Sequence, residues 1–212
     1  MRDMTGWWTK ITGGWRGRTN GAGPSEALRR FRADVHAAVS GALDRDALDR
    51  LLQRPGAEGL SDDDVELEVE ALQGACDLLD LQDRVAREGL PVVPHQHKTL
   101  AGERCAFIAS VSLTDEASQR TGRLFLTEKR LVFVSTPLVA LPWGAINRIV
   151  DDGRDLIVAA PGRGALHRFR CNSFADARCG RWLAERLRED AQAAPHPNPL
   201  PAGGERGPVD SL

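Results

Sequence analysis

The spacing of apolar residues changes once along this chain, at about residue 98. Before that point apolar side chains recur every three or four residues, and after it they alternate with polar ones in short runs. The first spacing is typical of a helix with a buried face, and the second of a strand with a buried face. The change predicts an α+β protein, in which a helical part precedes an antiparallel sheet.

Residues 25–90 are expected to form a helical hairpin or bundle. Ser25 is a good N-cap for the first helix, and a short second helix, about residues 44–54, is expected to end at a Pro-Gly pair. A third helix is expected to begin after Ser61, where three aspartates suit the positive end of the helix dipole. Its apolar residues cover more than one stripe, so it is expected to pack on two sides.

About seven short strands and one closing helix are predicted for residues 98–190. A long alternating run starts at Cys105, and a polar turn at residues 128–130 joins two later runs into a hairpin. Asn172 and Ser173 then cap a helix that is expected to shield the open end of a bent sheet. Its expected apolar face consists of Ala175, Cys179, Trp182, Leu183 and Leu187.

The hairpin GRLFLTEKRLVF, residues 122–133, resembles the GRAM and bacterial pleckstrin-homology (PH)-like superfamily, which often carries a G-x-L-x-L-T-x-x-R-L-V-F pattern. The segment LPWGAI, residues 141–146, is similar to the family's I-P-W-x-x-I strand, and Trp182 matches a tryptophan in its last helix. The resemblance covers residues 98–190 and implies a PH-like antiparallel β-barrel closed by a C-terminal helix. It implies a binding module, and lipid, peptide and protein ligands all remain open.

Five arginines are the candidate ligand-binding residues. Arg168 and Arg170 share one face of the last predicted strand, and Arg163 lies in the turn before it. Such a row of arginines can bind a phosphate or a carboxylate-rich partner through paired N–H donors. More often, a row of charged residues on a strand is simply a face exposed to solvent. Arg120 and Arg123 follow the first loop but do not reproduce the motif of the phosphoinositide-binding family members, which argues against that ligand.

Residues 1–24, called the leader below, contain three of the five tryptophans of the chain. Trp7, Trp8, Ile11 and Trp15 would fall on one side of a helix, and their basic neighbours give this stretch the character of an interfacial membrane anchor. Two glycines disfavour a stable helix there. The alternative is an arm that packs on the chain's own helical part, so these four residues are candidate anchors to either a membrane or a partner.

No metal, cofactor or catalytic centre is predicted. His95 and His97 supply two imidazoles, but no complete zinc ligand set has a convincing spacing, and both are expected to be exposed linker residues. His167, Cys171 and Cys179 lack a recognisable catalytic context, and no nucleophile elbow or phosphate loop is found. The formal charge of −2 gives no overall attraction to nucleic acid.

The protein is expected to be cytoplasmic and reduced. Its four cysteines are widely spaced, and no stretch approaches the ~20 apolar residues that span a bilayer. The cysteines are therefore expected to behave as small buried apolar residues. Arginine far outnumbers lysine, which is typical of a GC-rich bacterial genome.

Four regions follow from these observations: the leader, residues 1–24; a helical domain, residues 25–90; a PH/GRAM-like domain, residues 98–190; and a Pro- and Gly-rich tail, residues 191–212, expected to be disordered. The predicted function is non-catalytic binding, as an adaptor or scaffold for a protein partner. The alternative is a peripheral protein of the inner membrane face that binds anionic lipid through the leader and the barrel arginines. The sequence indicates no particular oligomeric state.

Overall fold

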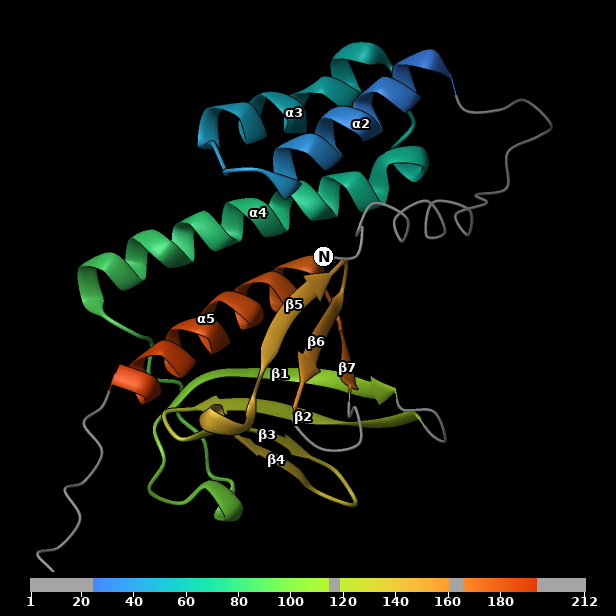
Figure 1. Cartoon of the computed structure of the whole chain (residues 1–212). Helices are drawn as coiled ribbons and strands as arrows, with labels where there is room; N and C mark the ends of the chain where they lie inside the picture. Colours follow the sequence, from blue (N-terminus) through green and yellow to red (C-terminus); the bar gives the residue numbers. More distant parts are fainter. Residues whose placement is uncertain (1–24, 115–118, 161–165, 194–212) are drawn as a thin grey trace, which may run out of the picture.

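The computed structural model of the chain describes residues 25–114, 119–160 and 166–193 (Figure 1). Helices come first, followed by a sheet and a last helix. The helices are α2 (Glu26–Ser40), α3 (Arg45–Glu58), α4 (Asp62–Glu88) and α5 (Phe174–Ala193), with short 3₁₀ helices η2 (Lys98–Leu100) and η3 (Trp143–Ala145). The strands are β1 (Cys105–Thr114), β2 (Gln119–Thr127), β3 (Arg130–Val134), β4 (Val139–Pro142), β5 (Arg148–Asp152), β6 (Asp155–Ala159) and β7 (Leu166–Cys171).

The first three helices begin where the sequence predicts. The Ser25 side chain accepts a hydrogen bond from Leu28 N at 3.1 Å. Ser61 occupies the N-cap position of α4, but its side chain makes no capping hydrogen bond. The predicted end of α3 is wrong, because the buried Pro55 lies inside the helix. The helix instead ends at Gly59, whose φ of 62° suits glycine.

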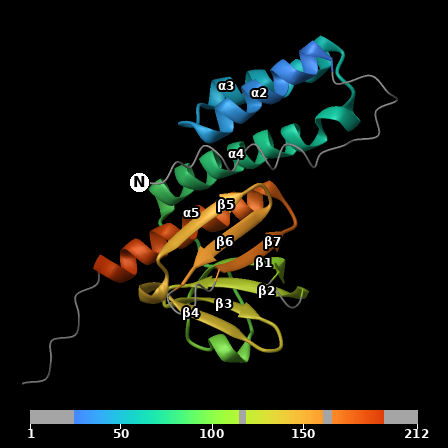
Figure 2. The same ribbon diagram turned by 45° about the vertical axis from the view of Figure 1, so that its right-hand side comes forward.

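Helix α4 lies between the α2–α3 pair and α5 (Figures 1 and 2). Leu72 and Ala75, in its first half, belong to a cluster with the buried residues of α2 and α3. Leu81, in its second half, belongs to the core of the sheet, and Val85 packs against that core. The prediction that this helix packs on two sides is confirmed.

The sheet has the strand order β4-β3-β2-β1-β7-β6-β5, and every neighbouring pair is antiparallel. The predicted α+β fold, with helices first, then an antiparallel sheet and a C-terminal helix, is confirmed. The sheet is not closed, however, because β4 and β5 are edge strands joined in sequence by η3. Trp143 of η3 is 1% exposed, belongs to the core of the sheet and donates from Nε1 to Thr127 O at 2.9 Å.

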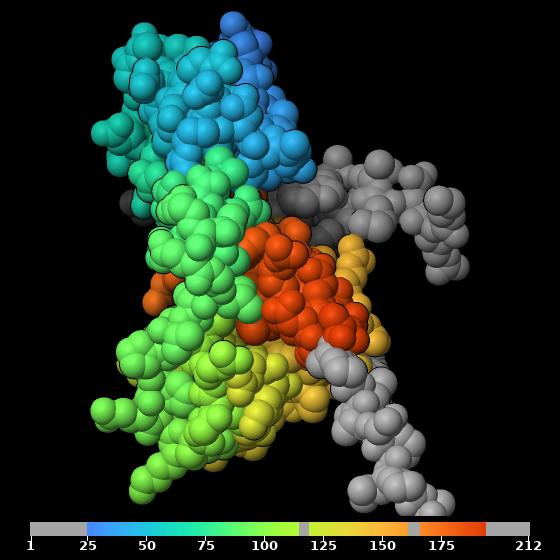
Figure 3. Space-filling model, turned by 90° about the vertical axis from the view of Figure 1, so that its left-hand side faces the viewer, coloured from blue at the N-terminus to red at the C-terminus, as the bar shows by residue number. Residues whose placement is uncertain are grey.

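Helix α5 packs along the sheet beside α4 (Figure 3). Its buried residues are Ala177, Gly180, Leu183, Ala184 and Leu187, which differ in part from the predicted face. Gly180 faces Phe107 of β1, whereas Ala175 faces Gly74 of α4. The helix therefore has two packed sides, and Trp182, which was predicted to be buried, is only half-buried.

Candidate functional site

The predicted hairpin motif is organised around Thr127, which is fully buried at the end of β2. Its Oγ1 accepts hydrogen bonds from the backbone nitrogens of Lys129 and Arg130 at 3.2 and 3.1 Å. The same hydroxyl lies 2.8 Å from Glu103 Oε2, to which it donates. One threonine thus closes the β2–β3 turn and fixes the segment that precedes β1.

Arg130, the arginine of the same motif, forms an ion pair with Glu103. Its Nη2 donates to Glu103 Oε1 at 2.6 Å and to the carbonyl of Thr99 at 3.2 Å. Burial alone would raise the pKa of Glu103, but the hydrogen bonds from Arg130 and Thr127 outweigh burial and lower it. The contacts of these motif residues are all within the protein, so their role is structural. The motif therefore gives information on structure and does not identify a ligand.

The outer surface of the sheet presents a row of arginines and hydroxyls, which we call the outer polar face. Its members are Ser110, Ser112, Thr114, Thr121, Arg123, Arg168 and Arg170. Ser112 pairs with Arg170 on β7 and with Thr121 on β2, and Ser110 pairs with Arg123. Paired residues share a face, so three of the five candidate arginines lie on one surface.

Arg120, another of the candidate arginines, does not join this surface. Arg120 pairs with Leu113, which is 1% exposed, and so belongs to the opposite face of the sheet. Its Nη1 donates to the carbonyl of Pro137 at 2.9 Å. Arg163 lies outside the described residues, as do the candidate anchors Trp7, Trp8, Ile11 and Trp15 and the tail from residue 194 onward.

Asp155 is the residue of this surface that sequence reasoning missed. It is 6% exposed, and its two carboxylate oxygens accept from Arg168 Nη1 at 3.1 Å and from Arg170 Nη1 at 3.2 Å. Asp152 lies 4.0 Å from Arg168, and burial raises the pKa of this second carboxyl, an effect that Arg168 partly offsets. Asp155 holds the two guanidinium groups in place while each keeps further N–H donors for a ligand.

The predicted linker histidines pack against the sheet and are not exposed. The rings of His95 and His97 lie 6.1 and 5.8 Å from the ring of Phe125 on the outer side of β2. His95 Nε2 is 2.9 Å from the carbonyl of Glu103. Across residues 25–114, 119–160 and 166–193, no three His, Cys, Asp or Glu side chains form a group that could hold a metal ion.

The four cysteines are free thiols. Cys105 and Cys171 are buried, and Cys76 and Cys179 are half-buried. Burial raises the pKa of Cys171 and of Cys179 to about 12, so neither thiol ionises appreciably at neutral pH. The ring of His167 stacks on Phe169 at 6.2 Å. This arrangement favours a structural role for these residues, as the sequence suggests.

No protein-family model matches the sequence, and no curated protein shows significant similarity to it. Among solved structures, the C-terminal domain of an unknown protein from Leishmania infantum is 17% identical and matches with a TM-score of 0.36, over 42% of this chain and 88% of that one. Inner Membrane Complex Sub-compartment Protein 1 from Toxoplasma gondii is 16% identical with a TM-score of 0.36, over 54% and 93%.

A complex of human RhoA with the DH/PH fragment of PDZRHOGEF also matches, with 10% identity and a TM-score of 0.37. The match covers 77% of this chain but only 52% of that chain. Such distant likenesses give no information on function. No helix of the described part of the chain is long and apolar enough to cross a membrane.

Proposed function

We propose that the chain is a non-catalytic binding module that holds a protein partner on the outer polar face, as an adaptor or scaffold does. The observation that carries this proposal is the pairing of Arg168 and Arg170 with the buried Asp155. Leu166, on the same face of β7, is 57% exposed and adds an apolar contact. Arginine is one of the residues that are enriched in protein interfaces.

The charge balance of the face favours a protein over an anionic membrane. Asp155 and Asp152 lie within ion-pair distance of the arginines, so a multiply charged phosphate would approach two carboxylates together with the guanidinium groups. Carbonyl oxygens and single carboxylates of a protein meet less repulsion and match the remaining N–H donors.

Site-specific photo-crosslinking tests the proposal. A benzoylphenylalanine at Leu166 is expected to give a discrete crosslinked product in the cells of origin, because this position lies on the binding surface. The same group at Leu138, which is 42% exposed on the β3–β4 turn, serves as the matched control. Thr114→Trp, which adds bulk opposite Arg168, is expected to abolish the product, whereas equal labelling at both positions would contradict the proposal.

The alternative, binding to anionic lipid through Arg123, Arg168, Arg170 and the leader, is tested with vesicles. We expect no more protein to pellet with phosphatidylserine-containing vesicles than with phosphatidylcholine vesicles. Pelleting that requires phosphatidylserine, falls with salt and is lost in Arg168→Glu would establish the lipid function instead.

The proposal also includes membership of residues 98–190 in the GRAM and bacterial PH-like group and a cytoplasmic location. The grouping is supported by the hydrogen bonds through which Thr127 and Arg130 of the motif connect the β2–β3 turn to Glu103. Replacing residues 122–133 by the corresponding hairpin of an established GRAM domain is expected to leave the melting temperature within a few degrees of the original. An unfolded hybrid would argue against this grouping.

A further inference from the structure

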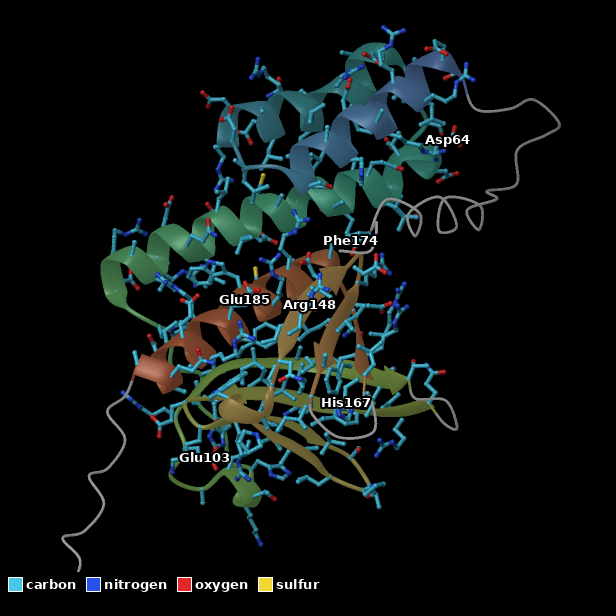
Figure 4. The ribbon with its side chains drawn as sticks, in the orientation of Figure 1. Asp64, Glu103, Arg148, His167, Phe174 and Glu185 are labelled. Carbon is cyan, nitrogen blue, oxygen red and sulfur yellow. The ribbon has the colours of Figure 1, made fainter. Side chains whose placement is uncertain are left out.

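An open groove of about 440 Å³ lies between the first half of α4 and the β5–β6 turn, in the region between the labels Asp64 and Phe174 in Figure 4. Asp62, Glu66 and Glu70 line it from successive turns of α4. Val69 lies between them, is half-buried and gives the groove an apolar component, whereas Val65 is only 1% exposed. Its size falls within the range of roughly 300–1,000 Å³ that is usual for sites that enclose a ligand group.

Two of these acids, Asp62 and Glu66, form no ion pair among the residues that the structure describes. Glu70 is paired with Arg154, whose pKa is raised first by the hydrogen bond to Glu70 and in part by the charge of Glu66. Asp62 and Glu66 are exposed and form no ion pair within residues 25–114, 119–160 and 166–193. The groove therefore suits an occupant that is both basic and apolar.

We propose that the leader of this same chain occupies the groove. The leader contains three tryptophans, and its charged side chains are Arg2, Lys10, Arg16 and Arg18 against the single acid Asp3. Trp15 is placed against Val69, and Arg16 or Arg18 beside Asp62 and Glu66. Aromatic burial and charge pairing then act at the same site.

The point of attachment brings the leader within reach. Arg32 of α2 donates to the carbonyl of Asp64 at 2.8 Å and pairs with Glu68 at 3.0 Å, so α2 passes the first turns of α4. Ser25, seven positions earlier, lies about 10 Å along the helix from Arg32. Nine residues lie between Ser25 and Trp15, so the ten Cα–Cα steps that join the two span up to about 33 Å.

Tethering also favours the leader over a separate molecule. A segment joined by a short linker competes at an effective concentration in the millimolar range, well above that of a free partner. The inference does not depend on the outer polar face, whose residues do not line the groove. If the groove holds the leader, Trp15 is not available to a membrane, and the arm interpretation of this segment holds.

Crosslinking in the full chain tests the inference. A benzoylphenylalanine at Val69, in the groove, is expected to crosslink to residues 7–18 within one molecule, as mapped by mass spectrometry. Glu66→Lys is expected to lower the yield about fivefold, because it repels the basic leader. Asp63→Lys is the matched control, since Asp63 is exposed on the same helix end but does not line the groove. Arg16→Glu or Arg18→Glu combined with Glu66→Lys is expected to restore the yield.

Each other outcome overturns the inference. In a mixture of ¹⁵N-labelled and unlabelled protein, crosslinks that join a heavy and a light chain would assign the groove to a second copy. Crosslinks to other segments, or equal losses in Glu66→Lys and Asp63→Lys, would remove the leader as the occupant. The absence of any crosslink from Val69 would show that the groove is open.

Discussion

Glu70 of α4 and Arg154 of the β5–β6 turn form an ion pair that joins the helices to the sheet. Arg154 Nε donates to the two carboxylate oxygens at 3.0 and 3.1 Å. Glu70 Oε1 also accepts a hydrogen bond from the backbone nitrogen of Phe174, the first residue of α5, at 3.1 Å. A single carboxylate therefore contacts both the sheet and the N-terminal end of α5, where negative charge is favoured.

Replacing Glu70 by Gln is expected to lower the free energy of unfolding by about 1–2 kcal/mol, because the pair is only partly exposed and serves two donors. Urea denaturation measures this loss. Glu26→Gln is the control, since the Arg29–Glu26 pair is well exposed and is expected to change stability by less than about 0.5 kcal/mol. Equal effects of the two substitutions would mean that the Glu70 contact does not stabilise the junction.

The contact between α4 and α5 depends on glycine at position 74. A Cβ there would lie 2.8 Å from the backbone nitrogen of Ala175, so the two helices would have to separate. Gly74→Ala is expected to destabilise the protein by about 1–3 kcal/mol, despite the higher helix propensity of alanine.

Gly56 provides the matched control for this substitution. It lies within α3, and nothing lies within 4 Å of the position a Cβ would take. Gly56→Ala is therefore expected to raise stability by up to about 1 kcal/mol. Melting temperatures that move in the same direction in both variants would contradict the close approach of α4 and α5.

The lowered pKa of Glu103 predicts a specific loss of stability in acid. Because the folded protein holds this proton less tightly than the unfolded chain, the charged carboxylate stabilises the fold above its ordinary pKa of 4.5. The contribution is lost as the pH falls through the lower pKa of the folded state. Glu103→Gln is expected to unfold about 1–3 kcal/mol more easily at neutral pH.

The same variant is expected to approach the unsubstituted protein in stability as the pH drops below about 4.5. Chemical denaturation across this pH range checks the convergence. Glu128→Gln is the control, because its partner Arg104 is 77% exposed and their pair is expected to contribute little. A constant difference between Glu103→Gln and the unsubstituted protein at every pH would contradict the assigned pKa shift.

Cys179 is expected to react slowly with iodoacetamide even though it is half-buried rather than fully buried. With a pKa of about 12, about one thiol in ten thousand is ionised at pH 8. Cys171 is expected to behave likewise, and both should react quickly after unfolding in urea. Mass spectrometry of tryptic peptides follows the labelling. Rapid modification of Cys179 in the native protein would indicate a lowered pKa and a reactive thiol.

The strands and helices could be predicted because their signals are local. Alternation over Cys105–Thr114 identifies β1, and the Asp152-Gly153 turn separates β5 from β6. The open sheet could not be predicted, since closure depends on whether the edge strands β4 and β5 pair, and a local sequence pattern does not determine that. The face of α5 was only partly right, because a helix with two neighbours buries more than one stripe and no periodicity says which neighbour covers which side.

For the candidate site too, features that depend on one strand could be predicted, and contacts between strands could not. Arg168 and Arg170 were placed on one face by alternation within a single strand, which needs no knowledge of the neighbours. The separation of Arg120 from Arg123 depends on the alternation of β2, which presents the two residues to opposite faces. Asp155 could not be identified from the sequence, because its ion pair with Arg170 depends on the β6–β7 register, which is set by tertiary structure.

Because α4 belongs to two hydrophobic clusters, unfolding of the helices and unfolding of the sheet are coupled. Leu72 packs with α2 and α3 while Leu81 packs with the sheet, so neither cluster can open without exposing part of the same helix. Backbone amides in the middle of α4 should therefore exchange with solvent only when the whole fold opens. A ligand that binds the sheet would stabilise the folded state of the whole protein. The helices α2 and α3 would then open less often as well, although neither helix touches that ligand.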